Sequence, residues 1–294
     1  MNRLAKIQKE ILRWYSREAR NLPWRKTRNP YRILLSEVML QQTQVHRVRQ
    51  KYPLFLKRFP SLGSLARART ASVIRAWQGM GYNNRAVRLQ RLAKKVLYQY
   101  NSRLPHAISE LESLPGIGPY TSRAVSCFAF GQRVHVVDTN IRRVLQRIFP
   151  RESKRLRIWD VAEWALPKRN AYFWNQSLME LGSRICVGRN PRCAHCPVNR
   201  FCPSAFKRNY QPGKNGRQEP GRNGIPNRIY RGRIIESLRD SRCFVKASVL
   251  GKQIKPDFRS NDRPWLHQLL RDLERDGVVR VKNHCKDLKV SLPR

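Results

Sequence analysis

Apolar residues recur every three or four positions along the first two hundred residues of the chain. The segments SVIRAWQGMG, RAVRLQRLAKKVLYQY and TSRAVSCFAFG show this period, and proline and glycine separate them. This spacing predicts amphipathic helices that each bury one face. No segment between residues 1 and 204 shows the alternation of a half-buried strand, so we expect an all-α region.

The pattern changes after residue 204. Residues 205–228 are rich in Gly, Pro, Asn and Arg and contain few apolar residues, which predicts a flexible basic linker. Periodicity returns in residues 229–294, where GRIIESLRD and PWLHQLLRDLERDG predict helices and VVRVKNHCKDLKVSLPR predicts a two-stranded hairpin. Helices followed by a basic hairpin resemble a small α+β module of the winged-helix type.

The N-terminal segment MNRLAKIQKEILRWYSREARN is basic and amphipathic, with Leu4, Ile7 and Ile11 on one helical face. It lacks the continuous apolar run of a signal peptide, so we expect a first structural helix. No apolar run approaches the roughly 18 residues that a membrane span needs. We therefore expect no membrane partner.

Charge indicates the kind of partner. The chain has 294 residues, with 61 Lys+Arg, 19 Asp+Glu and a formal net charge of +42. An excess of this size predicts a polyanionic partner, and nucleic acid is the commonest one. A generally basic proteome is an alternative source for part of the excess.

Four of the seven cysteines lie in one 17-residue loop, CVGRNPRCAHCPVNRFC, at Cys186, Cys193, Cys196 and Cys202. Structural zinc sites usually combine two separated CxxC or CxxH pairs, whereas this loop holds one. Four thiolates in one loop suit a [4Fe-4S] cluster, so the spacing favours iron–sulfur over zinc. We expect His195 to be a surface residue. The cysteine pattern favours a reducing intracellular compartment, the cytoplasm or nucleoid, over a disulfide framework.

One carboxylate stands inside an apolar run. Glu37 occurs in ILLSEVMLQQT, and burying a carboxylate is costly unless it is paired or protonated. One interpretation is a helix whose narrow polar stripe contains Ser36 and Glu37. The other is a chemical role for a buried acid.

Two further motifs have a functional and a structural interpretation. In LPGIGPYTSRA, the bare backbone at Gly116 and Gly118 could approach a phosphate at the following helix N-terminus, and the alternative is a plain helical hairpin. In VVDTNIRRVL, Asp138 precedes a helical pattern, where aspartate commonly caps a helix.

Taken together, the motifs resemble the endonuclease III superfamily of helix-hairpin-helix DNA glycosylases, and most closely its MutY-type adenine glycosylases. The matching segments, in family order, are LPWR, NPYRILLSEVMLQQTQV, WQGMGYNNRA, LPGIGPYTSRA, VVDTNIRRVL, WNQSLMELGSRIC and the cysteine loop. The resemblance covers residues 1–204. It implies an all-α glycosylase domain with a [4Fe-4S] loop at residues 186–202. We expect a monomer that acts on double-stranded DNA with a mismatched or damaged base pair.

The resemblance implies catalytic roles. Glu37 would face the pocket for a flipped-out base, where apolar surroundings keep a carboxylic acid protonated and able to donate to the leaving adenine. Asp138 would stay ionised and stabilise the oxocarbenium-like sugar, or add to it before water does. Tyr120 and Asn140 would orient Asp138 and the sugar. Tyr120 stands where bifunctional relatives carry a Schiff-base lysine, so we expect little or no strand cleavage.

The resemblance also implies DNA-binding residues. Those assigned to the base stack around the orphaned base are Gln41, Gln42, Thr43 and Tyr82. Arg25 and Gln176 correspond to positions near the adenine pocket, with a phosphate contact or helix packing as the alternative. Gly116 and Gly118 would hold the DNA backbone near the lesion.

The sequence also departs from the family pattern. VVDTN replaces the usual DGN, GMGYNNRA lacks the second tyrosine of GYY, and residues 229–294 do not resemble the Nudix-like domain with which MutY reads 8-oxoguanine. We expect a monofunctional glycosylase that removes adenine opposite 8-oxoguanine or guanine. A thymine or uracil glycosylase acting at G:T or G:U is one alternative, which QQT with Tyr82 disfavours. A non-catalytic DNA-binding iron–sulfur protein is another, which the pair Glu37 and Asp138 disfavours.

Overall fold

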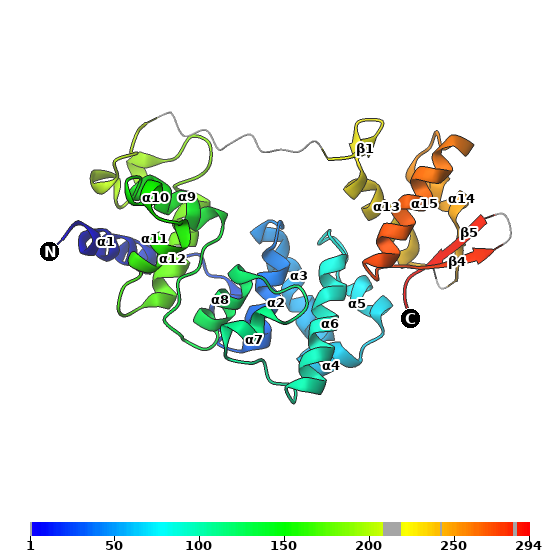
Figure 1. The fold of residues 1–294 in the computed structure, drawn as a ribbon, viewed down its shortest axis with the longest axis horizontal. Coiled ribbons are helices and arrows are strands. Elements are labelled where there is room, and N and C mark those ends of the chain that lie inside the picture. The colour runs from blue at the N-terminus through cyan, green and yellow to red at the C-terminus, as the bar shows by residue number, and fades with distance from the viewer. Residues whose placement is uncertain (1, 208–218, 242, 285–286) are drawn as a thin grey trace. The chain divides into compact units, whose positions relative to one another are not determined.

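The computed structural model describes residues 2–207, 219–241, 243–284 and 287–294. These residues form two compact units (Figure 1). The first unit comprises the described residues within 1–34, 106–113 and 117–215, and the second comprises those within 35–105, 114–116 and 216–294. The chain therefore passes from one unit to the other several times.

The first unit is helical, as the periodicity predicted. Its elements are α1 (Arg3–Glu18), η1 (Pro23–Arg25), α7 (Ile108–Glu112), α8 (Pro119–Phe128), α9 (Thr139–Ile148), α10 (Glu152–Arg155), α11 (Ile158–Trp164), α12 (Ala171–Arg184), η2 (Cys193–His195) and η3 (Asn199–Phe201). The predicted first helix is confirmed as α1, whose Ile7 and Ile11 are buried in a core with Val144 of α9 and Leu181 of α12. Helix α2 (Pro30–Leu40) begins in this unit and ends in the second.

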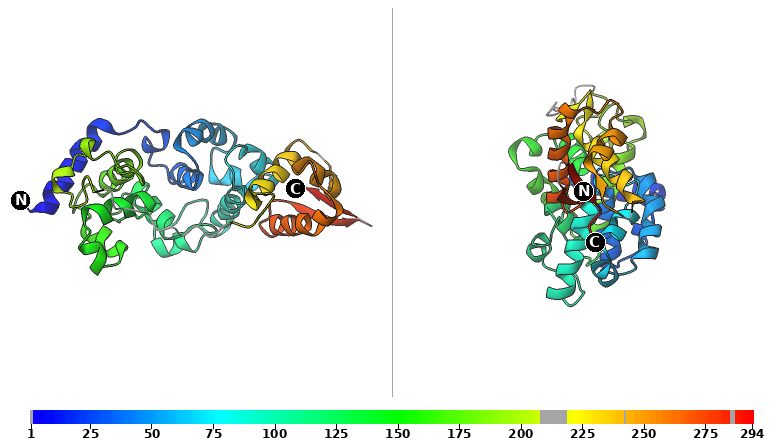
Figure 2. Two further views of the ribbon diagram at one scale, coloured as in Figure 1. Left: turned by 90° about the horizontal axis from the view of Figure 1, so that it is seen from above. Right: turned by 90° about the vertical axis from the view of Figure 1, so that its right-hand side faces the viewer.

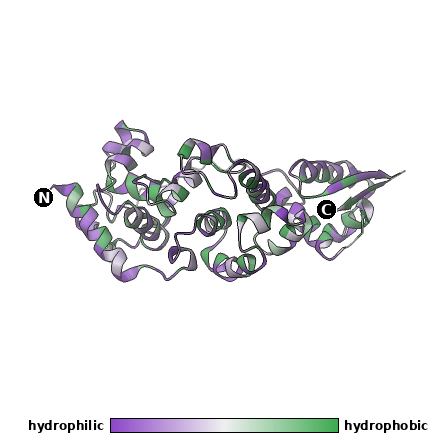
Figure 3. Cartoon of the chain, turned by 90° about the horizontal axis from the view of Figure 1, so that it is seen from below, coloured by the Kyte–Doolittle hydropathy of each residue, from purple (hydrophilic) through white to green (hydrophobic). Residues whose placement is uncertain are grey.

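The N-terminal part of the second unit is also helical. Its elements are α3 (Val45–Arg58), α4 (Leu62–Arg67), α5 (Thr70–Ala76) and α6 (Asn84–Gln99). Hydrophobic and hydrophilic residues interleave along most helices (Figure 3), as expected for helices that each bury one face. Between residues 2 and 207, all of which the structure describes, there is no strand, which confirms the all-α prediction.

The C-terminal part of the second unit has a winged-helix topology. Its elements are α13 (Asn227–Arg239), β3 (Val245–Lys246), α14 (Ala247–Ile254), η4 (Ser260–Asp262), α15 (Arg263–Arg275), β4 (Arg280–His284) and β5 (Asp287–Ser291). The strands form an antiparallel sheet in the order β3-β5-β4, with Val281 opposite Val290. Figure 2 shows the β4–β5 hairpin, in red, beside the orange α15. The two predicted helices and the hairpin are confirmed, whereas α14 and β3 were not predicted.

The predicted linker contains some regular structure. Residues 208–218 lie outside the described residues. Strands β1 (Gly221–Arg222) and β2 (Ile225–Pro226) pair with each other, and α13 begins two residues before the predicted start of the module. Arg222 explains part of this order, because its guanidinium forms an ion pair with Asp262 at 2.7 Å and its carbonyl accepts a hydrogen bond from Tyr230 at 3.2 Å. The predicted domain boundaries themselves stay predictions.

The C-terminal module shares its core with the helices that precede it in the second unit. Ile74 of α5 and Val87 of α6 are buried in the same apolar cluster as Leu238 of α13 and Leu270 of α15. The Ala71 N–H also donates to the Pro293 carbonyl at 3.1 Å. The module is thus packed against α5 and α6. In the described part of the chain, no helix combines the length and apolar character that crossing a bilayer requires.

Candidate active site

Glu37 is a buried residue of α2. Ser36 and Glu37 are 1% and 5% exposed, so the interpretation that they form a polar stripe facing solvent is wrong. The reason is that α2 is buried around its circumference from Ile33 to Met39, which leaves no face for solvent. A carboxyl group in this position is costly as an anion unless its charge is compensated.

Two turns of the second unit contain residues predicted to enter the base stack. Gln42 follows α2 and has a φ of 54°, and Tyr82 precedes α6 and has a φ of 44°. Positive φ is costly for residues with a bulky side chain and persists only when the surroundings enforce it. Both side chains are exposed, Tyr82 by 45%. The structure therefore presents a polar and an aromatic side chain on two strained turns.

Arg85 of α6 is buried and satisfies the end of α2. Its Nη1 donates to the carbonyls of Val38 at 2.8 Å, Met39 at 3.0 Å and Gln41 at 2.6 Å. The last carbonyls of a helix have no intrahelical partner, so this guanidinium serves as a side-chain cap. Burial lowers the pKa of Arg85 to about 10, which still leaves it charged at neutral pH.

The same guanidinium also holds the second turn. Its Nη2 donates to Thr43 Oγ1 at 3.0 Å and to the carbonyls of Met80 at 2.8 Å and Gly81 at 3.2 Å. Arg85 therefore connects the two turns that carry Gln42 and Tyr82. The sequence did contain a signal for this residue, because Arg85 lies in the same helical phase as Leu89 and Leu92.

Asp138 is the N-cap of α9. Its Oδ1 accepts a hydrogen bond from the Ile141 N–H at 2.6 Å, and its Oδ2 accepts one from Asn140 Nδ2 at 3.0 Å. The capping interpretation is thus confirmed, and the structure brings two predicted catalytic residues together. Burial raises the pKa of Asp138 above its usual 3.8, although these hydrogen bonds and the charge of Arg143 oppose the shift. Its predicted ionised state stays a prediction.

Arg143 links Asn140 to α12 and to the cysteine loop. Its Nη2 donates to Asn140 Oδ1 at 2.7 Å and to the Gly182 carbonyl at 2.6 Å, and its Nε donates to the Cys186 carbonyl at 2.7 Å. Gly182 allows the close approach, because a Cβ there would lie 2.7 Å from Asn140 Cβ. Arg143 was not predicted as a site residue, since nothing in the sequence distinguishes it from a surface arginine.

The predicted helical hairpin connects α7 to α8. Gly116 has a φ of 81°, which favours glycine, and Gly118 is the N-cap of α8. An added Cβ at Gly118 would meet no described atom within 4 Å, so the N-terminus of α8 is open there. Tyr120, the second residue of α8, packs against the core of the first unit.

The four loop cysteines line one cavity of about 270 Å³, together with Leu181 and Ile185. Burial raises the pKa of the Cys196 thiol to about 12, and the neighbouring thiols add to the shift. Four thiols around one cavity fit the ligand set of a [4Fe-4S] cluster. In the parts of the chain that the structure describes, no group of three or more His, Cys, Asp and Glu side chains is placed so that it could hold a single metal ion.

Arg147 of α9 anchors the cysteine loop. It is 5% exposed, and its Nη1 donates to Cys186 Sγ at 3.3 Å and to the Val187 carbonyl at 2.7 Å. Its Nη2 donates to the Gly188 carbonyl at 3.0 Å. Arg143 and Arg147 thus hold the start of the loop from successive turns of one helix.

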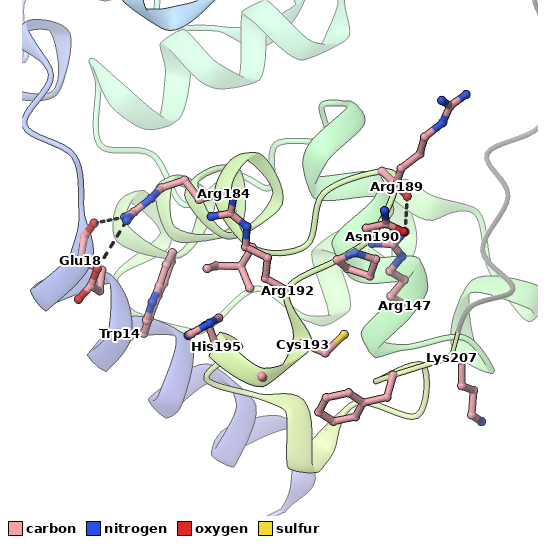
Figure 4. Close-up of a pocket in the computed structure, with 15 residues that line it drawn as sticks. Trp14, Glu18, Arg147, Arg184, Arg189, Asn190, Arg192, Cys193, His195 and Lys207 are labelled. Carbon is pink, nitrogen blue, oxygen red and sulfur yellow. Dashed lines mark hydrogen bonds and ion pairs between the residues drawn. The ribbon is translucent and has the colours of Figure 1, made fainter.

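A wide hollow lies beside the cysteine loop (Figure 4). Its basic side chains include the exposed Arg189 and Arg192, and neither Glu37 nor Asp138 lines it. His195 is exposed, which confirms that it is a surface residue. The hollow is therefore a basic surface outside the predicted catalytic residues.

Arg25 and Gln176 contact each other inside the first unit. Arg25 Nε donates to Gln176 Oε1 at 2.9 Å, and Arg25 Nη2 donates to Glu180 Oε2 at 2.8 Å. Glu180 is fully buried and also accepts a hydrogen bond from Arg20 Nε at 2.6 Å. These contacts favour helix packing, which was the alternative interpretation for both residues. A role of Arg25 and Gln176 near an adenine pocket stays a prediction. Glu180 was not predicted as a site residue.

The predicted residues thus fall into separate groups. Glu37, Gln42 and Tyr82 belong to the second unit, whereas Asp138 and Tyr120 belong to the first.

Comparison with known proteins identifies the class. Residues 35–158 match the family model of the HhH-GPD superfamily base excision DNA repair proteins. A solved thermostable thymine-DNA glycosylase superposes with a TM-score of 0.65 at 30% identity, covering 68% of this chain and 95% of that one. An endonuclease III–DNA complex superposes with a TM-score of 0.62 at 22% identity, covering 71% and 99%, and so shares the fold. The helical fold and the family-model match over residues 35–158 define the class of the protein, which is a helix-hairpin-helix base excision DNA repair protein.

A curated relative narrows the class. An adenine DNA glycosylase of Mycobacterium tuberculosis is 38% identical over 278 residues, which cover 89% of this chain and 88% of that protein. That coverage exceeds what residues 1–228 could supply, so the match includes part of the C-terminal module. The chain belongs to the adenine DNA glycosylase branch, the MutY-type branch, of the HhH-GPD superfamily. The family indicated by the sequence motifs is thereby confirmed.

Glu180→Gln tests the buried ion pair. Burial alone would raise the pKa of Glu180, but the hydrogen bonds and charges of Arg20 and Arg25 outweigh it and hold the pKa below its usual 4.5. The resulting stabilisation is therefore complete above about pH 4.5 and is lost as the pH falls through the lower folded-state pKa. We expect the variant to lose roughly 3 kcal/mol of unfolding free energy at pH 7 and to show a weaker acid dependence.

Urea titrations between pH 7 and pH 3 measure this difference. Glu10→Gln is the control, because its pair with Arg13 is exposed and contributes at most about 1 kcal/mol. Equal losses of unfolding free energy in the two variants would show that the buried ion pair stabilises the protein no more than the exposed pair does.

Proposed function

We propose that this protein is a monofunctional DNA glycosylase that removes adenine mispaired with 8-oxoguanine or guanine in double-stranded DNA. The observation that carries this proposal is the buried carboxyl group of Glu37 in a chain of the adenine glycosylase branch. The family match over residues 35–158 spans both Glu37 and Asp138. A protein that only binds DNA does not need a buried acid such as Glu37, whereas Asp138 also serves as the cap of α9.

Glu37 supplies the proton for departure of the base. Adenine leaves poorly as an anion, and protonation of a ring nitrogen makes the departure feasible. In this proposal the buried Glu37 carries a proton until the base leaves. The C1′–N9 bond breaks as the proton moves from Glu37 to the base, and adenine leaves as a neutral molecule.

Asp138 acts on the sugar. Loss of the base leaves positive charge on C1′ and the ring oxygen, which a nearby carboxylate stabilises. The hydrogen bonds from Ile141 and Asn140 fix the orientation of this carboxylate before the substrate arrives. Water then forms the new C1′–O bond and releases a proton to the solvent, which leaves an abasic site and an intact strand.

Tyr120 restricts the reaction to removal of the base, without strand cleavage. A bifunctional glycosylase needs an amine that replaces the base as a Schiff base on C1′. A phenol in place of that amine cannot form one, so base removal is not followed by elimination. The Tyr120 phenol also belongs to the unit that contains Asp138, which suits a role in orienting the sugar.

DNA binding combines the open backbone of the hairpin with exposed side chains. In this proposal the amides at Gly116 and Gly118 bind a DNA phosphate at the N-terminus of α8, where the backbone is open at Gly118, and Gly116 packs against Arg88. Gln41 and Thr43 flank Gln42, which enters the base stack with Tyr82 and offsets the unstacking that base flipping requires. Exposed arginines beside the cysteine loop add phosphate contacts, so affinity should fall steeply with salt.

The four loop cysteines hold a [4Fe-4S] cluster in this proposal. When bound, the cluster brings redox-active iron whose ligand positions the four thiolates fill. The protein uses the loop to position DNA, and Arg143 and Arg147 connect the loop to α9, whose N-cap is Asp138. Arg25 and Gln176 are proposed to support the adenine pocket through their mutual hydrogen bond.

The substrate is tested by single-turnover base release from duplexes with A:8-oxoguanine, A:G, A:C, G:T and G:U pairs. We expect adenine release from the first two and strand breaks only after alkali treatment, because Tyr120 cannot form a Schiff base. Release of thymine or uracil instead would assign the protein to mismatch thymine repair. Breaks without alkali would contradict the monofunctional assignment.

Glu37→Gln tests the acid. The amide has the same shape but no acidic proton, so we expect base release to fall by about a hundredfold or more, while the dissociation constant for the mismatched duplex stays within a few-fold. Glu10→Gln is the control, since Glu10 pairs with Arg13 on the surface of α1 and belongs to none of the proposed sites. Base release at the parent rate in the Glu37→Gln variant would show that the acid role is wrong.

Cys196→Ser tests the cluster. We expect iron and sulfide, about four of each per chain in the parent, to be lost together with most of the DNA affinity. Cys243→Ser is the control, because Cys243 is exposed in the C-terminal module. Retention of full iron content in the Cys196→Ser variant would show that this thiol is not a ligand.

A further inference from the structure

The turn that presents Tyr82 needs support from outside itself. Gly79, Gly81 and Tyr82 all have positive φ. This conformation costs conformational free energy at Tyr82, whereas glycine adopts it readily. Arg85 holds the carbonyls of Met80 and Gly81 from the side of α6. The next residue after Tyr82, Asn83, is held from a different part of the chain.

Arg239 of the C-terminal module contacts this turn. Its side chain is 4% exposed, and its Nη2 donates to Asn83 Oδ1 at 2.9 Å. Its Nη1 donates to the Ile74 carbonyl in α5. Arg75 returns the contact by donating from Nε to the Arg239 carbonyl at 2.7 Å. One arginine of α13 is therefore bonded to residues on both sides of the turn.

Asn83 uses its side chain for this contact and not for a local cap. An asparagine at the N-cap normally accepts a hydrogen bond from the first turn of its own helix. Asn83 is the N-cap of α6, has no side-chain capping bond there and is 8% exposed. Its amide oxygen is instead bonded to the guanidinium of Arg239.

The contact between Arg239 and Asn83 lies beside a buried apolar core. Ile74 of α5 and Val87 of α6, which flank the turn, lie in the same apolar cluster as Leu238, the neighbour of Arg239. Gln78 Nε2 also donates to Glu236 Oε2 of α13 at 3.2 Å. Because the module is anchored by this core, Arg239 can restrain Asn83 and not merely follow it.

We infer that Arg239 is a positioning residue for base extrusion, through which the C-terminal module fixes the turn that presents Tyr82 to DNA. The inference rests on the proposed function, in which Tyr82 enters the base stack. A side chain that is already ordered in the free protein loses less freedom when it enters the duplex. The module thus gains a role in catalysis without touching the substrate.

Arg239→Met tests the restraint in the free protein. The substitution keeps a long apolar stem and removes the hydrogen bonds to Asn83 and Ile74, together with the ion pair to Glu236 in the same helix. We expect amide hydrogen exchange in residues 79–84 to become roughly tenfold faster, with the core of the module still protected. Arg233→Met is the matched control, because Arg233 lies on the same helix and bonds the Ile254 carbonyl within the module.

Three results of this experiment decide the restraint. Faster exchange at the turn in Arg239→Met alone supports it. Equal exchange at the turn in all three proteins overturns it. Exchange that rises across the whole module, in Arg239→Met and Arg233→Met alike, also overturns it, because Arg239 would then act only on stability. Should Arg239→Met not fold, Asn83→Ala removes the same bond while leaving the module unchanged.

Base extrusion is measured with 2-aminopurine as the target base. We expect Arg239→Met and Asn83→Ala each to reduce the fluorescence rise and single-turnover release about tenfold, and the double variant to be no worse than either. Arg239→Lys, which can still reach one acceptor, should recover part of the signal. Additive losses in the double variant would contradict a shared action at Asn83.

The two proposals fail in different ways. A parent protein that releases no base from any duplex would remove the proposed function, while the exchange experiment would still decide whether Arg239 restrains the turn. A parent that releases adenine, with the same exchange and release in Arg239→Met, would leave the function intact and overturn the positioning role.

Discussion

Buried guanidinium groups bonded to main-chain carbonyls hold the functional parts of this protein in place. Arg85 satisfies the free carbonyls at the end of α2, and Arg147 does the same for the cysteine loop. Burying such a charge is costly, and several short hydrogen bonds are needed to offset that cost. Each arginine therefore enforces one arrangement of the backbone around it, because any other would leave a charge buried without partners.

More of the fold than of these arginine contacts could be predicted from the sequence. Periodicity gave the helices of both units and the C-terminal hairpin, because burying one face leaves a regular trace in the residue pattern. It missed α14, which is a short helix that follows a strand of two residues. Asp138 was correctly interpreted as a cap, whereas the polar-stripe interpretation of Glu37 failed because a single helix does not show how many neighbours cover it.

The supporting arginines were missed for a different reason. Among 61 basic residues, a buried arginine looks like one more surface charge, and its carbonyl partners have no sequence signature. Arg239 and Asn83 are 156 positions apart, so only the tertiary structure brings them together. Among the described residues only four basic side chains are buried, and three buried acids oppose them, so nearly all of the formal +42 lies where DNA can reach it.

The left-handed backbone at Tyr82 has a consequence for how this protein can change. Glycine would suit that conformation better, so substitution there would relieve strain and raise thermal stability. The same change would remove the exposed aromatic ring. Selection or engineering for stability alone would therefore replace Tyr82. Variants at this position must also be tested for function.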